Sequence, residues 1–168
     1  VGMTGIASGR VARLDLKEAA DEVKHVNNEV SRQIGISFAA RCTTIKPSGT
    51  SSLVLGTSSG IHAWHNDYYL RRMRIGKNEA LYEYMKDNHP ELIEDDMLNS
   101  KQAIVCIPQK SPEGSILRNE DVMSMLERVK QFNMDWVRNG YRLGYNAKNV
   151  SATVYRRDDE CNKVGEWM

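Results

Sequence analysis

The chain has 168 residues, of which 40% are hydrophobic and 27% are charged, as in an ordinary globular domain with one core. Its 23 Lys and Arg residues nearly balance 22 Asp and Glu residues, so no strong charge would recruit nucleic acid or a membrane surface, and any phosphate-bearing partner should be small. No apolar stretch is long enough to span a membrane and the N-terminus does not resemble a signal peptide, so we expect a cytoplasmic location.

Residues 1–9 contain three glycines, lack an initiator methionine and show no apolar period, so we expect the chain to be a piece of a longer protein. A helix is predicted to begin after Asp15, a good N-cap, and to end at Gly35. The apolar residues at helical spacing between them are expected to face the core: Leu16, Ala19, Ala20, Val23, Val26, Val30 and Ile34.

Residues 41–52 are the segment around which we expect the chain to be organised. A short strand rich in Thr and Ile is followed by a turn at Pro47 and Gly49 and then by hydroxyl side chains before the apolar residues 53–55. A strand that ends in a tight turn and leads into a helix aims free backbone N–H groups at the turn, where an anion can bind. The expected phosphate ligands are Ser48, Gly49, Thr50, Ser51 and Ser52, with Lys46 adding a positive charge at the rim.

Two readings of this turn stay open from the residue types alone, because Pro, Ser, Gly and Thr also suit an ordinary capped turn before a helix. A Walker-type nucleotide triphosphatase is disfavoured, since no Gly-Lys-Ser/Thr triplet follows the turn.

Residues 53–60 predict one short helix and then a loop, because two glycines interrupt the apolar run. The loop leads into a cluster of aromatic and titratable residues that either lines a nucleotide or cofactor pocket or packs its rings onto the domain. The cluster consists of His62, Trp64, His65, Tyr68 and Tyr69. No catalytic triad is predicted, because no acidic or nucleophilic partner is fixed by the spacing.

The second half of the chain predicts alternating strands and helices. Residues 69–75 are strand-like, although their alternation is imperfect and a helix is the alternative. Asn78 is a candidate cap for a helix that stops before Pro90, and the acidic residues 94–96 are expected in a solvated loop. The continuous apolar run 103–108 is typical of a strand covered on both faces, which suggests a parallel sheet.

After a turn at residues 111–114, Asn119 or Asp121 should open a long helix that ends at Gly140. Residues 149–155 predict a further strand, and Asp158 or Asp159 a final helix. This alternation predicts an α/β fold with mainly parallel strands, whose active sites gather at the carboxyl ends of strands.

The three cysteines, Cys42, Cys106 and Cys161, are widely spaced and match no disulfide framework or metal-binding pattern. For Cys42 and Cys106, each inside a strand-like run, a small buried apolar side chain is the favoured interpretation. We therefore predict neither a catalytic residue nor a metal ligand within the chain.

Residues 41–52, together with residues 56–69 and the basic residues Arg71, Arg72 and Arg74, closely resemble adenosylcobalamin-dependent (class II) ribonucleotide reductases. The resemblance extends through the whole chain. It implies that the Pro-Ser-Gly-Thr turn, residues 47–50, holds the phosphates of a ribonucleotide substrate. It also implies that residues 1–168 are a single segment from the C-terminal portion of a ten-stranded α/β barrel, which could not close alone.

By this resemblance the full protein reduces ribonucleotides to deoxyribonucleotides for DNA synthesis by thiyl-radical chemistry. Its cofactor is adenosylcobalamin, its reductant a thioredoxin-type dithiol protein, and its other partner the remainder of the same catalytic chain. The radical and reducing cysteines are expected outside this segment. Val150-Ser151-Ala152 stands where family members that import their radical from a second subunit carry a tyrosine pair, which favours the cobalamin type.

Two other functions are compatible with these residues. The segment could be a non-catalytic phosphate-binding or scaffold module, or part of another α/β barrel enzyme that binds a flavin or a sugar phosphate. Nucleotide binding at residues 47–52 discriminates against the first alternative, and absence of a yellow flavin colour against the second.

Overall fold

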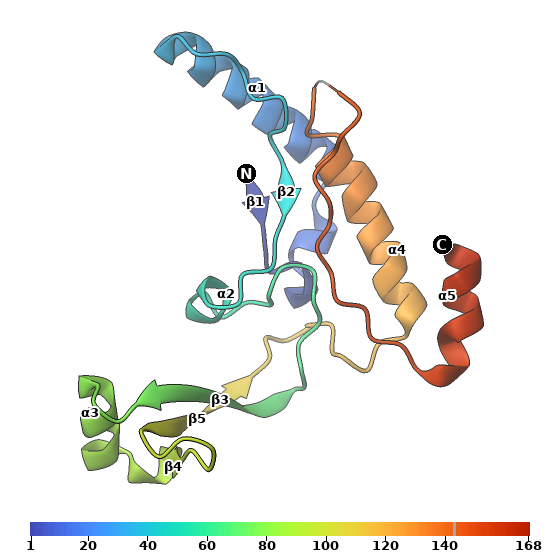
Figure 1. Ribbon diagram of the computed structural model, residues 1–168. Coiled ribbons are helices and arrows are strands. Elements are labelled where there is room, and N and C mark those ends of the chain that lie inside the picture. The colour runs from blue at the N-terminus through green and yellow to red at the C-terminus, as the bar shows by residue number, and fades with distance from the viewer. Residues whose placement is uncertain (143) are drawn as a thin grey trace. The chain divides into compact units, whose positions relative to one another are not determined.

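A computed structural model describes residues 1–142 and 144–168. The chain divides into two compact units, one formed by residues 1–65 and 112–168 and the other by residues 66–111 (Figure 1). Each unit has its own cluster of buried apolar side chains. Helices and strands occur in both, so the fold is mixed α/β as predicted, but in the part of the chain that the structure describes β3 (Tyr68–Gly76), β4 (Ile93–Asp95) and β5 (Gln102–Lys110) pair antiparallel, and the prediction of mainly parallel strands is wrong there.

The predicted first helix is confirmed as α1, Leu16–Ile34. The Asp15 carboxylate accepts hydrogen bonds of 3.0 Å from two backbone N–H groups of the first turn, and Gly35 ends the helix. Only the first half of the apolar stripe lies in the core, where Leu16 and Ala20 are buried. The second half is exposed at Val26, Val30 and Ile34.

The first unit contains a minimal parallel sheet. Strand β1, Gly2–Met3, pairs in parallel with β2, Thr44–Ile45, and Ile45 forms a parallel bridge to Val150 on its other side. The prediction of a strand at residues 149–155 is therefore wrong, because only Val150 pairs with a strand, through this single bridge. The backbone of this segment is used differently, because the Thr153 N–H donates to a histidine side chain rather than to a neighbouring strand.

Helix α4, Val122–Phe132, continues into the π-helical turn Asn133–Arg138 and ends near Gly140, as predicted. Its C-terminal part packs on the strand β2 region, where the Trp136 indole N–H donates to the Thr44 carbonyl at 3.1 Å. The buried Thr43 hydroxyl donates to the Trp136 carbonyl at 2.7 Å, and a Cβ on Gly140 would lie 1.7 Å from that hydroxyl oxygen. Only a glycine fits at position 140 without moving Thr43.

The chain ends in a short 3-10 turn, Asp158–Glu160, followed by α5, Cys161–Trp167, where the final helix was predicted. The buried Glu160 carboxylate accepts backbone hydrogen bonds from Arg157 at 2.7 Å and from Val122 at 3.2 Å. These two bonds lower the pKa of Glu160 below its ordinary value, and they tie the last turn to the start of α4.

The second unit is a three-stranded antiparallel sheet. Strands β3, Tyr68–Gly76, and β4, Ile93–Asp95, flank the central β5, Gln102–Lys110, and α3, Ala80–Asn88, lies beside β3 (Figure 1). The strand predicted from residues 103–108 is confirmed, but its placement in a parallel sheet is wrong. A continuous apolar run marks a central strand, and a central strand can have antiparallel neighbours.

The acidic residues 94–96 do not form the predicted solvated loop. Glu94 lies in strand β4 and pairs with Arg72, and the Arg74 Nε atom lies 2.6 Å from the Asp96 carboxylate. The backbone N–H of Leu98 and the Arg74 guanidinium both lower the pKa of Asp96. Arg72 and Arg74 of the basic cluster therefore neutralise acidic partners within this sheet.

Candidate functional site

The predicted phosphate turn lies between β2 and a single helical turn, α2, Ser51–Val54. Lys46 is exposed at the start of the turn, and Thr50 occupies the N-cap position without a side-chain capping bond. All five predicted ligands are brought together in this turn. Because α2 has only four residues, its dipole is small, and the chemistry of the turn depends on individual N–H and O–H groups.

The hydroxyl groups of the turn fall into an inner and an outer pair. Ser52 is buried and its hydroxyl donates to the Ser48 carbonyl, while the Ser48 hydroxyl lies 2.5 Å from that of Thr4. Thr50 and Ser51 are exposed, and their hydroxyls form no hydrogen bond within the part of the chain that the structure describes. Ser52 thus fastens the turn from the inside, Ser48 contacts Thr4 through its half-buried hydroxyl, and the Thr50 and Ser51 hydroxyls are exposed on the outer side.

Gly49 is not required by the fold. A Cβ built at this position would meet no atom within 4 Å, and the φ angle lies outside the left-handed region that favours glycine. Gly60 behaves in the opposite way, because its φ is 59° and its Cβ would lie 2.9 Å from the Lys46 carbonyl oxygen. Gly60 thus allows the following loop to pack against the turn, whereas a Cβ at position 49 would enter open space.

The glycine-rich N-terminal residues support this loop, a role that sequence reasoning missed. The Gly5 N–H donates to the Ser58 carbonyl at 3.1 Å, and the Ile6 N–H donates to the Gly60 carbonyl at 3.0 Å. The Ser8 hydroxyl accepts from the Ser58 N–H at 3.0 Å. The spacing of residues 1–9 carries no signal that links them to residues 57–60, so these contacts are seen only in the folded structure.

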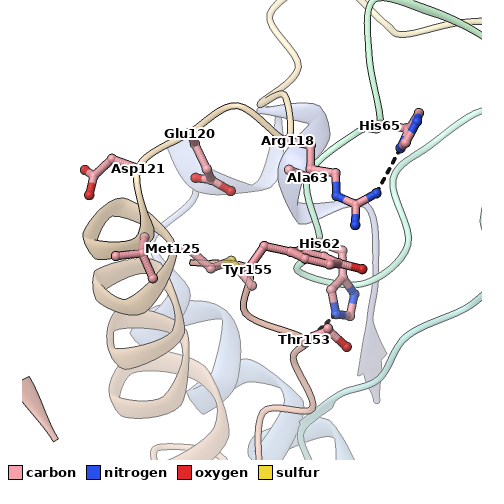
Figure 2. Close-up of a pocket in the computed structure, with 10 residues that line it drawn as sticks. His62, Ala63, His65, Arg118, Glu120, Asp121, Met125, Thr153 and Tyr155 are labelled. Carbon is pink, nitrogen blue, oxygen red and sulfur yellow. Dashed lines mark hydrogen bonds between the residues drawn. The ribbon is translucent and has the colours of Figure 1, made fainter. Parts of the chain in front are cut away.

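A second feature of the first unit is a cavity of about 200 Å³ (Figure 2). It is lined by residues from the loop after α2, the start of α4 and the C-terminal segment, among them His62, His65, Arg118, Glu120, Asp121 and Tyr155. The predicted aromatic and titratable cluster is only partly assembled here. His62 and His65 line the cavity, Trp64 is buried with its indole N–H on Ser8 at 3.2 Å, and Tyr68 and Tyr69 belong to the other unit.

His62 is fixed by two backbone groups. Its Nε2 atom accepts a 2.9 Å hydrogen bond from the Thr153 N–H, so Nε2 carries no proton and Nδ1 donates to the Ser59 carbonyl at 3.0 Å. A neutral imidazole in a defined tautomer therefore forms one wall of the cavity. Both ring nitrogens are committed to structure, so His62 is not placed to exchange protons with a ligand.

Arg118 is held by uncharged partners. Its guanidinium lies 3.7 Å from the centre of the Tyr155 ring and its Nη1 atom lies 3.1 Å from Nδ1 of His65, as Figure 2 shows for the histidine. The nearby acids are occupied elsewhere, because Glu120 pairs with Arg128 at 2.5 Å and Asp121 caps α4. Hydrogen bonds from the start of α4 lower the pKa of Asp121, which keeps it in the capping carboxylate form.

The residues that the structure describes contain no group of three or more His, Cys, Asp or Glu side chains that could hold a metal ion. In the same residues, no helix combines the length and the apolar character needed to cross a membrane. Cys42 and Cys106 are buried, as predicted, and Cys161 is exposed.

Comparisons with known proteins agree with the predicted resemblance, although no family model matches the chain. A probable adenosylcobalamin-dependent ribonucleoside-triphosphate reductase of Dictyostelium discoideum is 31% identical over 107 residues, which are 64% of this chain and 14% of that protein. The adenosylcobalamin-dependent ribonucleoside-triphosphate reductase of Euglena gracilis is 35% identical over 68 residues, 40% of this chain and 9% of that protein.

A crystal structure of a B12-dependent (class II) ribonucleotide reductase superposes with a TM-score of 0.75 at 19% identity, over 98% of this chain and 27% of that one. At this identity the superposition shows a shared fold. The similarity to adenosylcobalamin-dependent ribonucleotide reductases is thus confirmed, and the chain matches only a minor part of the length of each relative.

Proposed function

We propose that this chain is one segment of an adenosylcobalamin-dependent ribonucleotide reductase, which converts ribonucleotides to deoxyribonucleotides. The proposal is carried by one observation: the relatives found by sequence and the structural neighbour are all B12-dependent ribonucleotide reductases, and the structural neighbour covers 98% of this chain. The dithiol reductant and the cytoplasmic location are parts of the same proposal.

Within that enzyme, residues 1–168 are the C-terminal portion of the ten-stranded α/β barrel. The parallel neighbours in the first unit support this placement, because β1, β2 and Val150 lie side by side in one direction, as the strands of a parallel barrel do. Strands from the remainder of the full-length protein would close the barrel.

The turn at residues 47–52 binds the substrate phosphates. The exposed hydroxyls of Thr50 and Ser51 donate to phosphate oxygens, and the lack of a side chain at Gly49, where a Cβ would meet no atom within 4 Å, leaves room for a phosphate beside the turn. Ser48 donates from the inner side, and Ser52 contributes by fastening the turn through its bond to the Ser48 carbonyl. Anchoring the charged end of the nucleotide holds the ribose in position for reaction, and such positioning contributes substantially to catalysis.

Adenosylcobalamin supplies the radical chemistry when it is bound to the complete enzyme. The buried Cys42 and Cys106 do not suit a radical or a reducing thiol that must meet substrate or reductant.

The full-length protein should convert a ribonucleoside di- or triphosphate to its deoxy form, and only when both adenosylcobalamin and a dithiol are supplied. The 168-residue chain alone should show no turnover under the same conditions. Cofactor-independent reduction, or turnover by the isolated chain, would overturn the assignment. Absence of nucleotide binding at residues 47–52 would instead favour a scaffold role.

A further inference from the structure

The hydroxyl of Thr4 connects the candidate phosphate turn to the loop beneath it. Its oxygen accepts a hydrogen bond from the Gly60 N–H at 2.8 Å and lies 2.5 Å from the Ser48 hydroxyl and 3.3 Å from the Ser58 carbonyl. Thr4 and Ser48 are both half-buried. One side chain from the N-terminal strand region thus contacts the inner hydroxyl of the turn.

The groups involved fix the direction of one of these hydrogen bonds. The Gly60 N–H can only donate, so the Thr4 oxygen is an acceptor there and keeps one proton to donate. The Thr4 and Ser48 hydroxyl oxygens lie 2.5 Å apart and either can be the donor, while the Ser58 carbonyl, 3.3 Å from Thr4, can only accept. When a phosphate oxygen accepts the Ser48 proton, the Thr4 proton is the one left to bridge the two hydroxyls.

We propose that Thr4 is a positioning residue that turns the Ser48 hydroxyl into a donor for the substrate phosphate. The chain of donors runs from the Gly60 N–H to Thr4, from Thr4 to Ser48, and from Ser48 to a phosphate oxygen. Each bond polarises the next, and the last is strengthened because its acceptor is charged. This inference rests on the proposed phosphate-binding function of the turn.

The test is a double-mutant cycle in the full-length protein, with ribonucleotide and the matching ribonucleoside titrated into each variant. Thr4→Val keeps the shape of the side chain and removes the hydroxyl, and it should weaken nucleotide binding by about three- to tenfold while nucleoside binding stays unchanged. Thr4→Ser should restore nucleotide affinity to the parent value. Once Ser48 is changed to Ala, adding Thr4→Val should cause no further loss.

Ser8→Ala is the matched control for a purely structural effect. Ser8 contacts the same loop, through the Ser58 N–H at 3.0 Å and the Thr57 hydroxyl at 2.9 Å, but it makes no contact with Ser48 in the described part of the chain. Its loss should lower stability without the selective loss of nucleotide affinity that Thr4→Val causes.

Three outcomes separate the failure of this inference from failure of the turn itself. If Ser48→Ala weakens nucleotide binding and Thr4→Val does not, Thr4 has no positioning role although the turn binds phosphate. Additive losses in the double variant would mean that Thr4 acts through the fold, which also overturns the inference. If neither Ser48→Ala nor Ser51→Ala changes nucleotide affinity, the proposed function of the turn fails.

Discussion

Replacing Gly49 by alanine distinguishes a glycine required by the fold from one required by a ligand. The new Cβ would meet no atom within 4 Å and the φ angle suits any residue, so the folded state should tolerate it. Alanine also restricts the unfolded chain, which should raise the free energy of unfolding by about 0.4–1 kcal/mol. The same methyl group would occupy the space through which phosphate reaches the backbone, so ribonucleotide affinity should fall about tenfold or more, roughly 1.4 kcal/mol.

The assay pairs denaturant unfolding with calorimetric titration of a ribonucleotide into the full-length protein. Gly60→Ala is the matched control, because its φ of 59° and the Lys46 carbonyl 2.9 Å from its Cβ predict a loss of stability instead. Unchanged nucleotide affinity in a stable Gly49→Ala protein would refute the argument that the open space in front of Gly49 serves a ligand.

Three further predictions concern the fold. Gly140→Ala, whose Cβ would lie 1.7 Å from a buried threonine hydroxyl, should lower the free energy of unfolding by about 1–3 kcal/mol or more, and an unchanged denaturation midpoint would contradict the packing described. The carboxylate of Glu160 has a lowered pKa in the folded chain, so the stability it provides is present above its ordinary pKa of 4.5 and is lost as the pH falls through the lower folded value. Glu160→Gln should therefore make the free energy of unfolding depend less on pH on the acid side, and an unaltered pH dependence would count against this. Substitution of the buried Cys42 or Cys106 by serine should destabilise the protein more than substitution of the exposed Cys161 and should leave the chemical step intact, which single-turnover kinetics on folded variants would check.

Local signals in the sequence predicted most of the helix ends, although Glu79 and not the candidate Asn78 occupies the N-cap of α3. Asp15 and Asp121 both cap helices, and the glycines at 35 and 140 follow helix ends, because capping is decided by residues within one or two turns. The short helix after the phosphate turn was predicted from the glycines that interrupt the apolar run, for the same reason.

Contacts between distant residues could not be predicted in this way. The pairing of Arg74 with Asp96 depends on two strands that both flank β5, and strand direction depends on connections that an apolar run does not encode. Thr4 was missed for a similar reason, since its partners Ser48 and Gly60 are far along the chain. The five turn residues were identified from their chemistry and resemblance, whereas their division into inner and outer hydroxyls required the structure.

The phosphate-binding role of residues 47–52 is tested most directly by Ser51→Ala. The Ser51 side chain is exposed and makes no hydrogen bond to the described residues, so its removal should leave the free energy of unfolding nearly unchanged. Loss of one hydrogen bond to a charged phosphate, about 1.5–3 kcal/mol, should weaken binding of a ribonucleotide roughly ten- to a hundredfold. The matching ribonucleoside, titrated into the same two full-length proteins, should bind both equally. Equal losses for nucleotide and nucleoside would show that Ser51 acts through the fold, and would contradict phosphate binding by this turn.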